Sequence, residues 1–521
     1  MRRRGFAAHP AERGWLCRSG HPLNAALQKI RTLSLLGQAA VETVACRPSL
    51  AAALFILVAA TPLGAASVKV SSLPALERAL AMASPGDQIR LADGSYTSPG
   101  AITITNAGTT RRPILLAAET IGGAEIKGEG GFVLASPASH IVLQGFKFTH
   151  AGTVQVGVGA THCRVTRNLF ELANTGKAPY LQVAGDDNEI DFNTFQNKSN
   201  EGEMLTIQGP GTNGMAQRTW VHHNYFYHFV PTANNCSAIQ IGLSSRSMSS
   251  AFSLVEHNLF IDTRGENEGG ICNKSCDNIY RFNTFGQGCR ELSLRHGNRC
   301  QVYANFFIGS EGIRFFGRDH KIFSNYFEQC RPAINIGDGD AIIPPGGLRM
   351  HDRPDGVQVV FNTLVSNRVN VVMADRRRAF GATNFVFANN IIVGGGEAVS
   401  IKGPLAAARW EGNIIWGDVR GAGDLPAAGY VSMDPKLTRD TTCRYHLETS
   451  NPALGKAAGS YPFVTVDIDG QPRGPKKDIG ADERSTAPSR NRILTPADVG
   501  PHAPNPTSPQ IWPTHFRQEQ N

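Results

Sequence analysis

The chain has 521 residues, of which 41% are hydrophobic and 18% are charged, and its formal net charge is +8 at pH 7. This apolar content is enough to bury a large core. Most of the charge belongs to residues 1–66, which hold eight Lys/Arg and two Asp/Glu, so the rest of the chain has 43 basic and 41 acidic side chains. A nearly neutral body argues against a protein that coats a polyanion, but it is compatible with a local basic cleft.

The first recognisable pattern is the apolar segment SLAAALFILVAATPLGAA, residues 49–66, which follows a positive charge at Arg47. It is too short to span a membrane and is typical of a secretory signal, so we expect cleavage after Ala66 and a secreted or periplasmic protein. A buried core strand is the alternative. Residues 1–66 are thus interpreted as a leader. Because it contains no second Met, we also consider an over-extended gene start, with the natural start at a non-AUG codon such as that of Val41.

A short amphipathic helix is predicted directly after the leader. Leu73, Leu76, Leu80 and Ala83 recur at helical spacing and are followed by a Pro-Gly-Asp turn and an apolar strand. Such a helix covers the open end of a repeat structure, where the core and the strand edges would otherwise be exposed. We therefore expect an N-terminal capping helix.

The main structural signal is an Asn followed by an apolar or aromatic pair, in which Thr takes the first place three times. It recurs at Asn168, Asn193, Asn224, Asn258, Asn283, Asn305, Asn325, Asn362, Asn390 and Asn413. The intervals of 20 to 37 residues contain short alternating strands and no helical pattern, which is typical of a solenoid. They predict an all-β, right-handed, single-stranded parallel β-helix over residues 67–484. In it, each aromatic enters the core, and each Asn lies at a left-handed corner and hydrogen-bonds the next Asn.

Some segments depart from this regular pattern. The long intervals 193–224, 224–258 and 325–362 are expected to carry loops that project from one face, where binding sites usually lie. From residue 485 the chain is rich in Pro, Ser, Thr and Asn without periodicity, so residues 485–521 are predicted to be a disordered tail. The eight cysteines after the leader permit disulfides, but cysteines stacked in the core of the solenoid are at least as good an interpretation.

The densest group of chemically versatile residues lies in GENEGGICNKSCDN, residues 265–278, and in ELSLRHGN, residues 291–298. Lys274 and Arg295 are 21 residues apart, which is about one coil of the repeat. Residues one coil apart stack roughly 5 Å from each other. We therefore expect these two cations to be neighbours on one sheet face.

These motifs resemble the polysaccharide lyase family that contains chondroitinase B and the poly(β-D-mannuronate), or alginate, lyases. The resemblance covers about residues 67–483. It includes NNCSAIQIG, NKS, LSLRHGN, GIRFFG and the closing DIDGQPR and DIGADE, and the NKS and R-H-G-N pair is its most specific part.

The resemblance implies a Ca²⁺-assisted β-elimination on an acidic polysaccharide. Lys274 resembles the base that removes the C5 proton of a uronate, and Arg295 resembles the residue that assists at the leaving glycosidic oxygen. A sugar C5–H is too weak an acid unless its carboxylate is neutralised and the enolate-like intermediate is stabilised. Because a guanidinium hardly deprotonates, we expect Arg295 to stabilise charge while His296 or a water delivers the proton.

The family pattern also implies the calcium ligands. Asn234, Glu266 and Glu268 match them, with Asn235 as the alternative to Asn234, and hard oxygen ligands suit Ca²⁺. The second Glu lies six residues before Lys274, where the pattern leads us to expect five, so the two glycines between them are expected to form a bulge.

Arg314, about one coil beyond Arg295, together with Arg318 and His320, forms a basic strip that is expected to bind further uronates. Less specific interpretations remain open for each residue. Arg314 also fits an ion pair with a nearby acidic residue, and His296 also fits a turn cap. Two Glu residues in a Gly-rich turn are commonly solvated, as is a single Lys.

An alginate lyase acting on mannuronate-containing chains is the leading functional interpretation. A chondroitinase B-like enzyme acting on dermatan sulfate and a C5-epimerase are alternatives within the same fold. A non-catalytic β-helix that binds polysaccharide is the alternative from another class. The motif Gly185-Asp186-Asp187 faintly suggests a glycoside hydrolase with paired carboxylates, but the rest of that family's pattern is missing.

Overall fold

The computed structural model describes residues 65–506, except 174, 210–213, 232–235, 266–268, 343–349, 376–379, 418 and 441–443. The fold described below belongs to the unit Leu63–Asn521. All but the last two residues of the predicted leader lie outside the described part. Within the described part, no helix has the length and apolar character needed to cross a membrane.

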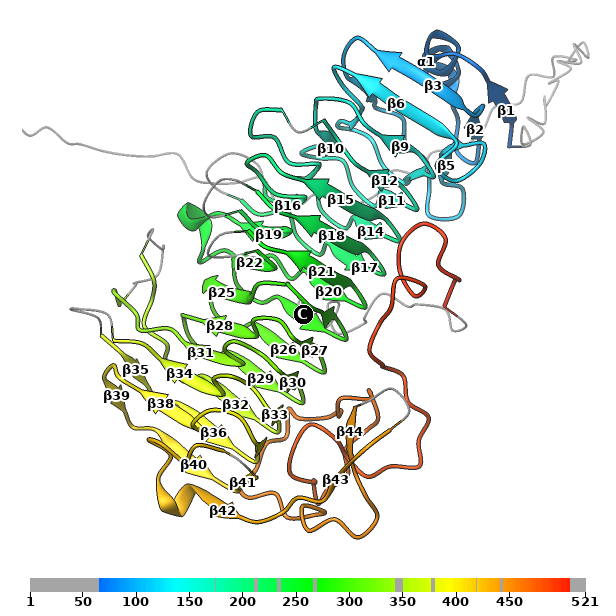
Figure 1. Cartoon of the computed structure of the whole chain (residues 1–521). Helices are drawn as coiled ribbons and strands as arrows, with labels where there is room; N and C mark the ends of the chain where they lie inside the picture. Colours follow the sequence, from blue (N-terminus) through cyan, green and yellow to red (C-terminus); the bar gives the residue numbers. More distant parts are fainter. Residues whose placement is uncertain are drawn as a thin grey trace, which may run out of the picture. The chain divides into compact units, whose positions relative to one another are not determined.

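Successive coils of the chain contribute strands to three parallel sheets, so the molecule is a right-handed parallel β-helix, as the repeat predicted (Figure 1). Sheet A consists of β1 (Ser67–Val70), β2 (Gln88–Leu91), β5 (Ile114–Ala118), β8 (Ile141–Gln144), β11 (Arg164–Thr166), β14 (Glu189–Asp191), β17 (Trp220–His222), β20 (Leu254–Glu256), β23 (Ile279–Arg281), β26 (Gln301–Tyr303), β29 (Lys321–Phe323), β32 (Gln358–Val360), β36 (Val386–Ala388) and β40 (Arg409–Glu411).

Sheet B follows sheet A along each coil. It consists of β3 (Gly94–Ser98), β6 (Ala124–Gly128), β9 (Lys147–Phe148), β12 (Leu169–Phe170), β15 (Thr194–Lys198), β18 (Tyr225–Phe229), β21 (Leu259–Thr263), β24 (Thr284–Phe285), β27 (Phe306–Ile308), β30 (Tyr326–Glu328), β33 (Thr363–Val365), β37 (Ile391–Val393), β41 (Asn413–Trp416) and β42 (Tyr430–Ser432).

Sheet C completes the coil. It consists of β4 (Ile102–Ile104), β7 (Phe132–Leu134), β10 (Val154–Val156), β13 (Leu181–Val183), β16 (Leu205–Ile207), β19 (Ile239–Gly242), β22 (Ile271–Lys274), β25 (Leu292–His296), β28 (Ile313–Phe315), β31 (Ile334–Ile336), β34 (Val371–Met373) and β38 (Val399–Ile401). The remaining elements are the parallel pair β35 (Ala382–Thr383) and β39 (Leu405–Ala406), the hairpin β43 (Leu437–Arg439) and β44 (Tyr445–Leu447), and the short 3-10 helices η1 (Ser244–Arg246) and η2 (Ala427–Gly429).

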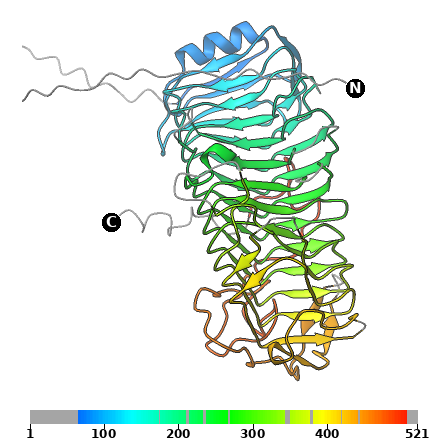
Figure 2. The same cartoon turned by 90° about the vertical axis from the view of Figure 1, so that its left-hand side faces the viewer.

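The predicted capping helix is α1 (Leu73–Met82), which covers the first coils (Figure 2). The hydroxyl of Ser72 accepts a hydrogen bond from the Ala75 N–H and so caps the N-terminus. Leu76 and Leu80 are buried and pack into the main core cluster. The amphipathic pattern therefore predicted both the helix and its buried face.

The corner between sheets A and B holds an uninterrupted asparagine ladder. All ten predicted residues are buried, and every Nδ2 except the last donates a 3.0 Å hydrogen bond to the Oδ1 of the next Asn. The left-handed residue, however, is the one before each Asn. Phe192, with a φ of 52°, and His257, also with a φ of 52°, are examples. The Asn is therefore free to bond along the solenoid while its predecessor makes the corner.

The aromatic residues that follow the ladder stack in the core, as predicted. Neighbouring rings of Phe170, Phe195, Phe226, Phe260, Phe285, Phe307 and Phe327 lie with their centroids 4.6 to 4.9 Å apart. Offset stacking of this kind adds to the burial of apolar surface. The seven cysteines that the structure describes are buried, which agrees with the core interpretation.

The prediction of a disordered tail from residue 485 is wrong as far as residue 506, where the described part ends. This segment runs back along the solenoid. The Asn491 side chain donates to the carbonyl of Ala304 at 2.9 Å, and the Gly500 N–H donates to the carbonyl of His223 at 2.9 Å. The segment is aperiodic because it binds the corners through its backbone and single side chains, not through a repeating buried face.

Candidate active site

The predicted catalytic residues lie on neighbouring strands of sheet C, the sheet on the side that Figure 2 turns toward the viewer. Lys274 ends β22, and Arg295 and His296 end β25. The predicted calcium ligands Asn234, Glu266 and Glu268, and the alternative Asn235, lie outside the described residues, so these ligand assignments stay predictions.

A β-bulge sets the relation between the two strands. The register runs without a break as far as Asn273, which pairs with Leu294, and then shifts so that Lys274 pairs with His296. Arg295 is therefore the extra residue of β25. The prediction of adjacent strands is right, but the in-register partner of Lys274 is His296, because a bulge adds one residue to the coil.

His296 is buried, and its ring stacks on that of His351 with a centroid distance of 5.5 Å. Burial, together with charge repulsion from His351, Arg295 and Lys274, lowers the pKa of His296 to about 3. The imidazole is thus neutral at pH 7. Its Nδ1 is buried and has no hydrogen-bond partner in the described part of the chain. A buried polar atom of this kind is expected where a ligand completes the site.

Lys274 is half-buried, and its Nζ donates a 2.6 Å hydrogen bond to Oε1 of Gln240 on β19. Glu203, just before β16, lies close enough for its charge to interact with that of Lys274. Burial raises the pKa of Glu203, and Lys274 and Lys198 oppose this rise. Gln240 and Glu203 were not among the residues that the sequence motifs predicted for the site. Gln240 belongs to the NNCSAIQIG motif, which is the signal that would have found it.

The predicted substrate-binding residues have different surroundings. The Arg314 Nε lies 2.9 Å from Oε1 of Glu291, and both side chains are largely buried. Burial raises the pKa of Glu291 to about 7, while Arg314 opposes this rise. Arg318 pairs with Asp352 at 3.1 Å and keeps one third of its side chain exposed. The ion-pair interpretation of Arg314 is therefore confirmed, and Arg318 is the more accessible of the two cations.

The prediction that His320 contacts substrate is wrong. The residue is fully buried, its Nε2 donates to the Phe316 carbonyl at 2.7 Å, and its Nδ1 accepts from the Cys300 N–H at 3.1 Å. Burial lowers its pKa to about 4. Both ring nitrogens serve the backbone of the turn, so His320 is structural.

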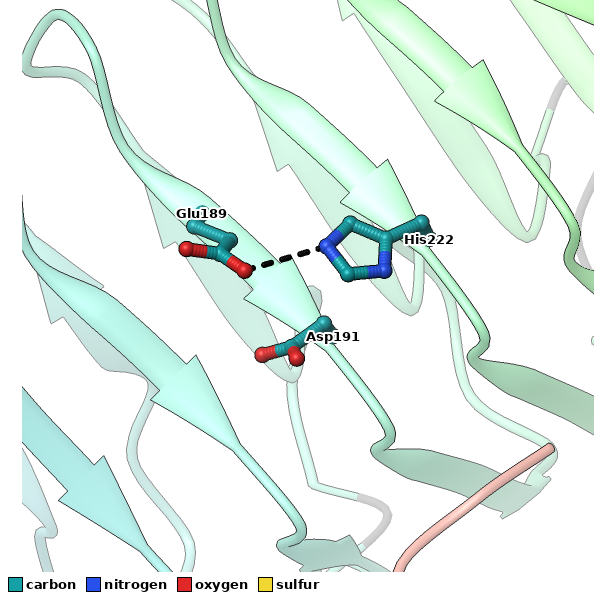
Figure 3. Close-up of side chains that lie close together, drawn as sticks. All are labelled: Glu189, Asp191 and His222. Carbon is teal, nitrogen blue, oxygen red and sulfur yellow. Dashed lines mark hydrogen bonds and ion pairs between the residues drawn. The ribbon is translucent and has the colours of Figure 1, made fainter. Parts of the chain in front are cut away.

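A second group of acidic residues and histidine lies on sheet A. His222 Nε2 is 3.1 Å from Oε1 of Glu189, and Asp191 lies beside them (Figure 3). The Arg164 guanidinium binds both oxygens of Asp191 and lies 3.4 Å from Glu189. Because Arg164 already pairs with both carboxylates, the arrangement is an ion-pair network in this structure.

Comparison with known families shows the family to which this chain belongs. The chondroitinase B family model matches residues 70–374, which is more than half of the chain. The chain belongs to the chondroitinase B family. Comparison with curated proteins gave no match.

Solved structures with the same fold include "PL6 family alginate lyase AlyGC", which is 26% identical with a TM-score of 0.67 and covers 74% of this chain. Another is "a mannuronic acid specific polysaccharide family 6 lyase enzyme from human gut microbiota", which is 25% identical with a TM-score of 0.58, covering 67% of this chain and 86% of that one. The chain spans 56% of the length of the first of these structures.

Proposed function

We propose that this protein is a secreted or periplasmic polysaccharide lyase that cleaves a uronate-containing polymer by β-elimination, and that its substrate is alginate rich in mannuronate. The observation that carries the proposal is the meeting of Lys274, Arg295 and His296 on β22 and β25. Family membership and the names of the alginate lyases with the same fold support it. The exported location rests on the signal-like segment 49–66.

Lys274 is the proposed base. Its Nζ donates a 2.6 Å hydrogen bond to Oε1 of Gln240 on the neighbouring strand β19, which helps to orient the amine on sheet C. In the proposed reaction Lys274 takes the C5 proton, the C4–O bond breaks, and the electron pair of the C5–H bond forms the C4–C5 double bond. Arg295 stabilises the negative charge that develops on the leaving oxygen.

His296 returns a proton to that oxygen in this scheme. Because its pKa is lowered to about 3, His296 is a neutral imidazole that relays a proton instead of storing one. The proton would pass from Lys274, or from water, through the His296 ring to the leaving oxygen. A proton passed on by Lys274 would restore its neutral amine for the next turnover.

Calcium is part of the proposal, with Asn234, Glu266 and Glu268 as the residues that would hold it. When bound, Ca²⁺ would neutralise the uronate carboxylate and thereby acidify the C5 proton. The described residues fit a cation nearby. Glu203 supplies a further carboxylate on this face, and the Thr206 Oγ1 is buried without a hydrogen-bond partner in the described part.

Arg318 is the residue that we propose for binding a further uronate, since its guanidinium is partly exposed. Arg314 would reach a substrate carboxylate only by sharing its charge with Glu291. A dermatan sulfate lyase is the second candidate, and the match to the chondroitinase B family model is the observation that favours it.

The test is the ultraviolet absorbance of the unsaturated uronate product after the protein is added to polymannuronate, polyguluronate or dermatan sulfate. We expect a rise with polymannuronate that EDTA abolishes and that Lys274→Ala reduces by about 10³-fold. The matched control is Lys147→Ala, which removes a partly exposed lysine of sheet B and should retain full activity. A rise with dermatan sulfate alone would favour the second candidate. No rise with any polymer would refute the lyase proposal.

A further inference from the structure

Inward-facing residues that pair in register on successive strands form columns along the β-helix. One such column in sheet C is apolar except at one position. The residues paired in register along one column are Val156, Val183, Ile207, Ile241, Asn273, Leu294, Phe315 and Ile336. Asn273 is fully buried and is the single polar member of this column. It directly precedes Lys274 in the chain.

Sheet A has a matching exception in β23, the strand that follows β22 in the chain. Its column consists of Val165, Ile190, Val221, Val255, Tyr280, Val302, Ile322, Val359 and Phe387. Tyr280 is fully buried and is the single residue of this column with a polar group. Two polar side chains thus enter the core on the consecutive strands β22 and β23, where every neighbouring coil has apolar residues.

The two exceptions meet across the core. The Tyr280 hydroxyl and the Asn278 Nδ2 both donate to the Asn273 Oδ1, each at 2.8 Å. The Asn273 Nδ2 in turn donates to the carbonyls of Ser275 and His296, each at 2.8 Å. The amide of Asn273 therefore uses its full hydrogen-bonding capacity. Burying polar groups in an apolar column is unfavourable unless they are completely paired, as they are here.

The network supplies a hydrogen-bond donor to the backbone carbonyl of His296. The register of β22 and β25 shifts between Asn273 and Lys274, so the ladder is interrupted next to His296. The Asn273 amide supplies a donor at this interruption. The network is also tied to the previous coil, because the Asn278 Oδ1 accepts from the Ser253 N–H at 2.9 Å. The bulge is thus supported from inside the core by side chains of two sheets.

We infer that Asn273 and Tyr280 are positioning residues, which hold the β25 bulge and thereby place Arg295 and His296 beside Lys274. The inference rests on the proposed function, because the geometry that it explains is that of the proposed elimination. Neither residue faces the outer surface of sheet C. They act only through the backbone at His296, and substitutions there are expected to change turnover more than substrate binding.

The first test is Tyr280→Phe, which keeps the ring in the core and removes the hydroxyl. We expect kcat to fall at least about tenfold, with KM unchanged within about twofold, because the outer binding face is intact. The matched control is Tyr326→Phe. Tyr326 is equally buried, and its hydroxyl donates to the Glu328 Oε2 at 2.8 Å on sheet B. The control is expected to lose comparable thermal stability but to keep wild-type kcat.

The second test is the double variant Asn273→Leu/Tyr280→Phe, which makes both columns fully apolar. It removes the donor and the acceptor of the Tyr280–Asn273 hydrogen bond together. Replacing both partners of this hydrogen bond by apolar groups of similar shape costs little stability. The Asn278 Nδ2 keeps its 2.8 Å hydrogen bond to the Ser275 Oγ, and the carbonyls that lose the Asn273 donor are those of Ser275 and His296, so this variant is expected to fold. Its crystal structure should show the bulge lost or moved, with Lys274 no longer opposite His296. That readout does not depend on activity.

The outcomes separate the two proposals. A loss of kcat in Tyr280→Phe, together with a changed register in the double variant, supports the positioning role. Wild-type kcat in both variants, or an unchanged bulge in the double variant, overturns it. A wild-type protein that forms no unsaturated product from any polymer counts against the lyase proposal, and the crystal structure of the double variant still decides whether the network holds the bulge.

Discussion

The asparagine ladder and the β22–β25 face use the same residue type in opposite ways. In the ladder each Asn repeats the bonding of its neighbour, and nothing distinguishes Asn258 from Asn283 except position. On the β22–β25 face a single Asn273 interrupts an apolar column and supports a bulge. Repetition thus stabilises the solenoid, and a local departure from repetition sets the geometry of the candidate site.

The largest predicted effect is a loss of folding stability when one residue of the asparagine ladder is replaced. The Asn258 side chain makes three donor and two acceptor hydrogen bonds in a fully buried corner. Asn258→Ala should lower the free energy of unfolding by about 3 kcal/mol, because several buried groups lose their partners. Urea denaturation measures the change, and kcat of the folded variant should stay within about twofold of wild type.

Asn384→Ala is the control for that substitution. Asn384 lies at another corner, where its side chain makes an exposed 2.7 Å hydrogen bond to Asp355. Its removal, which also leaves an Ala at a φ of 51°, should cost about 1–2 kcal/mol, less than the loss at Asn258. Equal losses in the two variants would contradict the view that the buried ladder is the stabilising element.

A smaller effect is expected from pH. Burial lowers the pKa of His150 to about 4 and that of His320 to about 4, well below the value of 6.5 that an unfolded chain has. The unfolded state therefore binds more protons as the pH falls below about 6.5, and stability decreases. We expect each residue to cost about 1–2 kcal/mol between pH 7 and pH 5. Urea midpoints at the two pH values measure this.

His150→Leu separates the contribution of one residue. It should weaken the pH dependence of the urea midpoint, because the buried imidazole is gone. The exposed His162 offers the matched substitution His162→Leu, which should leave the pH dependence unchanged. Loss of the same amount of pH dependence in both variants would show that burial of His150 is not the cause.

The smallest predicted effect concerns substrate binding. Arg318→Gln should raise KM for the polymer about three- to tenfold and leave kcat within about twofold, because the charge lies away from the reacting bond. Arg164→Gln on sheet A should leave KM unchanged, since Arg164 is engaged with Asp191 far along the chain from the candidate site. A change of kcat without a change of KM in Arg318→Gln would argue for a different role.

The sequence predicted the regular parts of the fold because they repeat. The spacing of ten Asn residues fixes the ladder, and the aromatic that follows each of the first seven fixes the core stack. It also placed Lys274 and Arg295 on adjacent strands. The spacing of 21 residues between Ile271 and Leu292 is one coil, so Arg295 was the expected partner of Lys274.

The bulge was not predictable from that spacing. One extra residue in β25 changes the partner of Lys274, although the NKS and R-H-G-N motifs themselves are the same. We attribute the bulge to a hydrogen bond between the Asn273 side chain and the His296 carbonyl on the next coil. His320 was misassigned for a related reason, because a histidine on a corner has the same spacing whether it points outward or into the turn. Such contacts depend on tertiary packing and not on periodicity.

The C-terminal segment has a consequence for how the protein is made. Synthesis produces the solenoid from the capped end, yet the carbonyl of His223 and the guanidinium of Arg167 bind Gly500 and Pro501. These early coils therefore receive their last partners only after a further 277 residues, for His223, and 334 residues, for Arg167, have been added. Until then their corners are hydrated. A nascent chain released before residue 500 would carry all three sheets but lack the brace that joins its first half to its end.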